Sequence, residues 1–158
     1  MRERVASDGV RQGRQLVLYR PSLNAADGRL EFTWRVDEKG VGWVFRAKDV
    51  NNYYAARIKV VRPGPAATLA VEHFTVYQGA ESAHSEKVLA FSRSVPVLSI
   101  RMEVAGPSFT LYLQGSAAEY WSDTRLTTGG VGFYEERNRP AEVQSLRMSF
   151  SAPASGGV

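Results

Sequence analysis

The sequence predicts an all-β sandwich of antiparallel strands. Apolar and polar residues alternate with a period of two along most of the chain, which is typical of strands with one buried face. Turn-forming residues separate these runs at the short spacing common in sandwiches and barrels. Sustained helical periodicity is missing from the sequence.

The runs can be justified in order from their own residues. Leu30, Phe32 and Trp34 alternate with polar neighbours, and later runs repeat this pattern. Turns are expected at 37–40 and 49–52, because Asp, Asn and Gly favour turn geometry. Residues 117–121 are the only stretch that could form a helical turn. Nine to eleven strands are predicted, with the clearest at 14–20, 30–36, 41–47, 53–62, 69–77, 87–91, 98–104, 109–113, 131–135 and 143–150.

The 158-residue length corresponds to one domain, which can bury roughly 70% of the surface that the unfolded chain exposes. The chain has no cysteine, which excludes disulfides, thiolate nucleophiles and cysteine-bound zinc. Apolar residues make up 44% of the chain and charged residues 23%, as in ordinary globular proteins. Because no apolar run approaches about 18 residues, no membrane span is predicted.

The net charge of +4 is concentrated at the start of the chain. The first 20 residues carry five arginines and two acidic residues, whereas the other 138 residues have a net charge of +1. A duplex-binding surface needs clustered cations, so no nucleic-acid partner is predicted. We expect a basic arm or linker at 1–13, the sandwich at 14–150 and a flexible tail at 151–158. An apolar leader is not expected within the first 23 residues, and the compartment is not predicted.

Two stretches carry a resemblance to a known superfamily. Residues 42–54 read Gly-Trp-Val-Phe-Arg-Ala-Lys-Asp-Val-Asn-Asn-Tyr-Tyr, and residues 129–134 read Gly-Gly-Val-Gly-Phe-Tyr. With these strings the chain resembles the concanavalin A-like lectin/glucanase (laminin-G-like) superfamily. The resemblance implies a two-sheet antiparallel jelly-roll sandwich. The same strings are similar to bacterial domains known as 3-keto-disaccharide hydrolases.

Glucanases of this superfamily carry Glu-x-Asp-x-Glu on one strand, which places a nucleophile and an acid on the same face. This string does not occur in the sequence. Glu135 and Glu136 face opposite ways on any strand, and Glu103 stands alone. Carboxylates from different strands could still meet. No catalytic residue is therefore predicted, and enzyme activity stays open.

No metal or cofactor is predicted. The only histidines are His73, on an expected strand, and His84, in an expected loop, and neither falls in a metal-binding motif. The hard oxygen ligands available for calcium, an ion that occurs in this superfamily, are Asp49, Asn51, Asn52 and Asp123. No Asp-x-Asp-x-Asp loop gathers them, so calcium remains an open alternative.

A binding surface is the remaining candidate. The polar residues between the inward-facing ones are expected to line one exposed face of the sheet. Aromatic rings offer apolar area to sugar C–H faces, while Arg, Glu and Gln bond to hydroxyls. This mixture suits a glycan or a polar peptide. The predicted ligand-binding residues are Arg35, Arg46, Tyr53, Arg57, Arg101, Glu103, Tyr112 and, at the rim, Trp121.

The sequence thus favours a non-catalytic recognition module that binds carbohydrate and belongs, with other domains, to a larger protein of bacterial type. One alternative is a glycoside-processing enzyme domain, which would need a cleft with two carboxyl groups about 5 to 9.5 Å apart. Another is a structural or protein-interaction domain without a small ligand, which would show an exposed apolar patch or a large interface.

Overall fold

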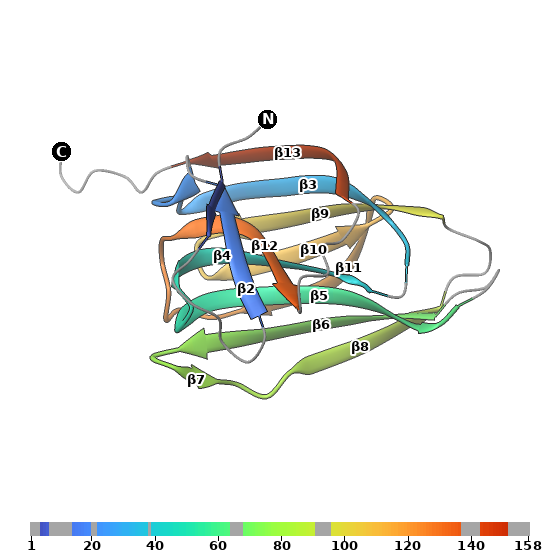
Figure 1. Ribbon diagram of the computed structural model, residues 1–158, viewed down its shortest axis with the longest axis horizontal. Coiled ribbons are helices and arrows are strands. Elements are labelled where there is room, and N and C mark those ends of the chain that lie inside the picture. Colours follow the sequence, from blue (N-terminus) through green and yellow to red (C-terminus); the bar gives the residue numbers. More distant parts are fainter. Residues whose placement is uncertain are drawn as a thin grey trace.

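Two antiparallel sheets form the two layers of a sandwich in the computed structural model, as predicted (Figure 1). The structure describes residues 4–6, 14–19, 22–37, 39–63, 68–90, 96–136 and 143–151. The five-stranded sheet has the order β11 (Ser116–Ser122), β10 (Ser108–Leu113), β9 (Val97–Ala105), β3 (Asp27–Arg35) and β13 (Val143–Ser151). The eight-stranded sheet has the order β1 (Arg4–Ala6), β2 (Arg14–Tyr19), β12 (Gly130–Glu136), β4 (Val41–Asp49), β5 (Asn52–Arg62), β6 (Thr68–Tyr77) and β7 (Ala80–Glu81), and β8 (Ser85–Ala90) also pairs with β6.

The alternating residues of both sheets meet in the main core. Trp34 of β3 and Trp43 of β4 are fully buried. Phe32 packs edge-on against Trp43 with ring centroids 5.6 Å apart, and Phe45 packs in the same way on Phe109 at 4.8 Å. Edge-to-face packing is a favoured arrangement of aromatic pairs. The predicted inward faces of β3 and β10 are therefore confirmed, and that of β4 is confirmed as far as Phe45 but not for Ala47, which lies beyond a register shift and packs on the other side of the sheet.

The two predicted turns have the expected chemistry. The Asp37 carboxylate accepts a hydrogen bond from the backbone N–H of Lys39 at 2.9 Å, and the backbone N–H of Gly40 donates to the Asp37 carbonyl at 3.2 Å. In the second turn, the Asp49 carboxylate accepts from the Asn51 N–H at 2.8 Å and from the Asn52 side chain at 3.1 Å. These short polar side chains fix the hairpins locally.

The one possible helical turn, at 117–121, does not form. These residues belong to β11, which pairs along its length with β10. Within the predicted basic arm, Arg4–Ala6 forms the short strand β1 beside β2. Residues 1–3 and 7–13 of that arm and residues 152–158 of the predicted tail lie outside the described residues. The described part of the chain contains no helix with the length and hydropathy to cross a bilayer.

The eight-stranded sheet curls strongly towards its outer side. Tyr134 of β12 and Phe74 of β6 have ring centroids only 6.3 Å apart, although β4 and β5 separate their strands in the sheet. In a flat sheet three strand spacings would place them about 14 Å apart. The Tyr134 ring lies over Gly42 of β4, where a Cβ atom would overlap the ring.

Apolar side chains fill the concave outer side of this sheet. The prediction of a polar outer face is therefore wrong for the centre of the eight-stranded sheet. The curl brings side chains of strands that are not neighbours into contact, so they bury one another. This outer cluster consists of Leu16, Leu18, Val44, Ala47, Tyr53, Ala55, Phe74, Val76 and Tyr134, all of them buried.

Candidate functional site

A groove of about 570 Å³ lies on the outer face of the five-stranded sheet. It combines residues of β3, β9, β10 and β13 with the turn after β10. We call it the outer groove. Its lining residues are Glu31, Phe32, Thr33, Ser99, Ile100, Arg101, Tyr112, Gln114, Gly115, Ser145 and Arg147.

Strand register places four lining residues in one row across the sheet. Arg147 of β13 is the Cα partner of Glu31 on β3, and Glu31 is the partner of Arg101 on β9. Arg101 is in turn the partner of Tyr112 on β10. Because neighbouring strands lie about 4.8 Å apart, this charged row is about 14 Å long.

A second, neutral row runs along the other side of the groove. Thr33 of β3 is the Cα partner of Ser99 on β9. The backbone N–H of Ser99 donates to Gln114 Oε1 at 2.6 Å, and the backbone N–H of Gln114 donates to the Ser99 carbonyl at 2.9 Å. Thr33 Oγ1 donates to the carbonyl of Gln144 at 3.1 Å. The neutral row is thus held by hydrogen bonds to the backbone of the neighbouring segments.

Arg101 is held in place from two sides. Its guanidinium carbon lies 4.1 Å from the centroid of the Tyr112 ring, and its Nε lies 3.1 Å from Glu103 Oε2. The contact with Glu103 is an ion pair without hydrogen-bond geometry, since Arg101 Nε is buried without a hydrogen-bond partner. A guanidinium stacked on a ring is well oriented for binding polar groups.

The edge strand β13 forms one wall of the outer groove through a β-bulge. Its register with β3 shifts between Gln144 and Arg147, and Ser145 has a φ of 50°. Leu146, within the bulge, is 42% exposed. A bulge re-aims the side chains that follow it. Here the residue after it is Arg147, which lines the groove.

The predicted ligand-binding residues do not share one face. Arg101, Glu103 and Tyr112 lie together on the outer side of the five-stranded sheet, where Arg101 and Tyr112 line the outer groove. Arg35 is exposed at the end of β3 and does not line the groove. Arg57 lies on the eight-stranded sheet, and its guanidinium donates to the Lys39 carbonyl at 3.4 Å.

The prediction that Arg46 is exposed is wrong, because only 3% of it is accessible. Its guanidinium donates to the Ala26 carbonyl at 3.1 and 3.3 Å and to the Leu126 carbonyl at 3.2 Å. It also contacts Asp27 Oδ1 at 3.2 Å. Burial lowers the pKa of Arg46 and the nearby Asp27 opposes that shift. Arg46 therefore joins loops at the end of the sandwich.

Tyr53 and Trp121 are also corrections to the predicted surface. Tyr53 is fully buried in the outer cluster, with its ring centroid 6.3 Å from that of Phe74. Trp121 packs against the main core and stacks on His73, with ring centroids 4.0 Å apart and an interplanar angle of 7°. Neither ring provides an exposed platform.

Residue alternation did not identify Glu31, Ser99 and Arg147 as groove residues. Glu31 and Ser99 alternate with buried neighbours, so they were visible as outward positions. Only strand order and register bring them together with Tyr112. Arg147 follows the bulge, and a bulge cannot be located from alternation alone.

A separate polar cluster lies on the eight-stranded sheet. Lys59 Nζ contacts Glu72 Oε2 at 3.3 Å and Glu86 Oε2 at 3.1 Å, so these oxygens are no more than about 6.4 Å apart. His84 contacts Glu72 Oε2 at 3.6 Å and Glu81 Oε2 at 2.6 Å. The hydrogen bond to Glu86 is the largest factor that raises the pKa of Lys59. The cluster is a network of ion pairs and hydrogen bonds.

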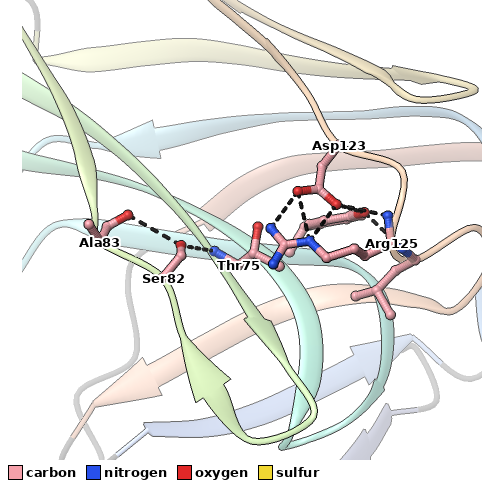
Figure 2. A network of polar contacts seen from close by, with 7 residues as sticks. Thr75, Ser82, Ala83, Asp123 and Arg125 are labelled. Atoms are coloured by element: carbon pink, nitrogen blue, oxygen red, sulfur yellow. Dashed lines mark hydrogen bonds and ion pairs between the residues drawn. The ribbon is translucent and has the colours of Figure 1, made fainter.

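The side chains of three calcium candidates, Asp49, Asn52 and Asp123, are engaged in hydrogen bonds with other parts of the protein. Figure 2 shows Asp123 facing Arg125, whose guanidinium approaches Asp123 Oδ2 at 2.5 Å. The Tyr54 hydroxyl donates to Asp123 Oδ1 at 2.7 Å and accepts from the Leu126 N–H at 2.9 Å. Figure 2 also shows a separate set of contacts that involves none of the calcium candidates, in which the Ser82 hydroxyl accepts from the Thr75 N–H and donates to the Ala83 carbonyl. Among the described residues no three His, Asp or Glu side chains lie close enough to hold a metal ion.

Replacing Asp123 with asparagine is expected to lower the free energy of unfolding by about 2 kcal/mol at pH 7. Burial favours the neutral acid, but hydrogen bonds from Arg125 and Tyr54 outweigh it and lower the pKa of Asp123 to about 2. A depressed carboxyl pKa stabilises the fold above the unfolded value of 3.8, and this contribution is lost as the pH falls towards 2. Urea unfolding from pH 7 to pH 2.5 measures the effect. The two proteins should converge at low pH, while a difference that persists unchanged there would contradict the assignment.

Comparisons with known proteins identify the fold. Neither a protein-family model nor a curated protein sequence matches the chain. Carbohydrate-binding module CBM66 from Bacillus subtilis superposes with a TM-score of 0.62 at 20% identity, over 92% of this chain and 91% of the module. A toad ovary galectin in complex with thio-digalactose superposes with a TM-score of 0.56 at 10% identity, over 93% and 97% of the two chains. A tetrameric galectin from the ball sponge Cinachyrella superposes with a TM-score of 0.50 at 16% identity, over 88% of this chain and 98% of the galectin. The jelly-roll sandwich is shared with all three.

Proposed function

We propose that this protein is a non-catalytic recognition domain that binds carbohydrate in the outer groove. The observation that best supports the proposal is the pairing of the two rows. The charged row offers a guanidinium fixed over an aromatic ring, and the neutral row offers hydroxyl and amide groups. A pocket with a few converging polar groups beside an aromatic ring is the usual form of a small-ligand site.

The groove chemistry suits a sugar ring. Saccharide hydroxyls need donors and acceptors at defined directions, and C–H faces need apolar area. Arg101 has terminal N–H groups without hydrogen bonds to described residues, and Gln114 retains its amide N–H₂ group because only its Oε1 is engaged. The ring of Tyr112 supports the guanidinium and adds its own edge to the groove.

The fold matches are consistent with this proposal. One is a carbohydrate-binding module, and another was solved with thio-digalactose. At 20% and 10% identity they supply the fold, so the contacts proposed here come from this chain's own groove. We further propose that the domain belongs to a larger protein of bacterial type.

One observation favours glycoside processing as a second candidate. The Oε2 atoms of Glu72 and Glu86 are no more than about 6.4 Å apart, since both contact Lys59 Nζ. Glycosidases use two carboxyl groups about 5 to 9.5 Å apart. Here both carboxylates are ion-paired with Lys59, and an ion-paired carboxylate is a poor proton donor. Product analysis with oligosaccharides, repeated with Glu72→Gln, tests this alternative, which requires cleavage that the substitution abolishes.

Replacing Tyr112 with alanine is expected to weaken saccharide binding at least tenfold, because Arg101 loses the ring that orients it. A glycan array identifies the saccharide, and calorimetry with the strongest array ligand measures the dissociation constant. Tyr120→Ala is the matched control, since Tyr120 is 62% exposed on the same sheet but does not line the outer groove. Arg101→Ala, which removes the guanidinium itself, should weaken binding to a similar extent. Arg62→Ala, at an exposed position of the eight-stranded sheet, is its control for the loss of an arginine.

Two outcomes would contradict the proposal. The first is that folded protein binds no saccharide on the array, and a peptide ligand would then be the alternative. The second is that Tyr112→Ala and Tyr120→Ala bind equally well, which would place the saccharide outside the outer groove.

A further inference from the structure

The charges around the outer groove are unevenly paired. Arg29 Nε lies 3.8 Å from Glu31 Oε1, and Arg101 Nε lies 3.1 Å from Glu103 Oε2. Arg29 is also the Cα partner of Glu103, and Glu31 is the partner of Arg101. These four side chains alternate in charge on β3 and β9, so each carboxylate has an arginine beside it and the group as a whole is neutral.

Arg147 does not belong to this neutral group of four side chains. It lines the outer groove and is exposed, and its side chain makes no ion pair or hydrogen bond with the other described residues. The groove lining contains two arginines, Arg101 and Arg147, and one carboxylate, Glu31. The lining therefore has one positive charge in excess, and the side chain responsible for it has no ionic partner among the described residues.

The two guanidiniums flank the groove on different strands. Arg147 is on β13 and Arg101 on β9, with β3 between them, so their strands are about 10 Å apart. The neutral row beside them carries no charged side chain that would repel an anion. An arginine presents a fork of N–H donors that matches a carboxylate or sulfate group.

We propose that the outer groove selects saccharides that carry an anionic group, a carboxylate or a sulfate, and that Arg147 binds this group while Arg101 contacts the adjoining ring. This inference rests on the proposed saccharide binding and adds the class of sugar. It also assigns Arg147 as the residue that determines specificity. Neutral saccharides lack the group that Arg147 would pair with, so they bind more weakly.

The test uses matched sugars that differ in charge. Tetragalacturonic acid is compared with its methyl ester, and a sulfated disaccharide with its desulfated form, by calorimetry at low and at high salt. We expect the anionic member of at least one pair to bind at least tenfold more tightly at low salt, with the preference falling as salt rises. Arg147→Gln should lower the affinity for the anionic sugar at least tenfold and leave the affinity for its neutral counterpart unchanged. Arg62→Gln should change neither affinity.

The possible failures are distinguishable. If the protein binds saccharides but does not prefer the anionic member of any pair, carbohydrate recognition stands and the charge selectivity is wrong. If the preference exists but Arg147→Gln keeps it, the assignment of Arg147 is wrong. If neither these sugars nor the glycan array gives binding, the proposed function itself fails.

Discussion

Replacing Arg46 with alanine is expected to lower the free energy of unfolding by about 3 to 5 kcal/mol. Arg46 is 3% exposed, and its guanidinium supplies donors to the carbonyls of Ala26 and Leu126. Without it, these carbonyls lose their charged partner at the end of the core. The guanidinium also lies over the Phe109 ring, with its central carbon 5.5 Å from the ring centroid, so its removal leaves a cavity against that ring.

Chemical unfolding of the two proteins at pH 7 measures this effect. Arg46→Lys serves as the control, because it keeps a positive charge but loses the fork of donors. Its free energy of unfolding should lie between those of the original protein and of Arg46→Ala. At a temperature where Arg46→Ala remains folded, its saccharide affinity should equal that of the original protein. Reduced affinity without reduced stability would mean that Arg46 contacts a ligand after all.

Introducing a side chain at Gly132 is expected to have the second largest effect. Gly132 of β12 is the Cα partner of Leu18 on β2. A Cβ atom there would overlap the carbonyl oxygen of Val17 and lie 2.7 Å from the Leu18 Cα. These are backbone atoms of the neighbouring strand, so the clash cannot be relieved by a side-chain rotation. We expect Gly132→Ala to cost about 3 kcal/mol or more.

Gly130 on the same strand is the matched control. A Cβ atom at Gly130 would meet the end of the Leu18 side chain at 3.0 Å and of the Leu23 side chain at 3.2 Å, which can move by a few tenths of an ångström. In thermal unfolding, Gly130→Ala should therefore have a much higher melting temperature than Gly132→Ala. Equal melting temperatures would mean that β2 does not pack against β12 as described.

Much of the fold could be predicted because alternation is a local property of a strand. Phe32, Trp34 and Trp43 each follow the period of two, and each is buried where the pattern placed it. The turns at Asp37 and Asp49 were also predictable, since the hydrogen bonds that make them lie within three residues of each carboxylate.

The misplaced residues lie where the strand register is irregular or where the sheet curls. Arg46 has a φ of 51° beside a register shift in β4, which turns its side chain from the expected face. Trp121 lies beyond a shift between Leu111 and Tyr112 in the pairing of β10 with β11. Tyr53 keeps its predicted side but is buried, because the curl of the sheet folds other strands over it. Bulges and curl depend on contacts between distant segments.

The two sheets of the sandwich differ in how much of their outer surface is buried. At the central strands of the eight-stranded sheet both surfaces carry apolar packing, so substitutions of these buried residues compromise folding. On the five-stranded sheet the outward residues of β3, β9 and β10 are polar, apart from Val97 and Ala105 at the ends of β9, and their inward neighbours belong to the core. Substitutions in the outward rows therefore remove little buried apolar area. Under the proposed function, this layer can change its ligand preference through substitutions in these rows while the rest of the scaffold stays unchanged.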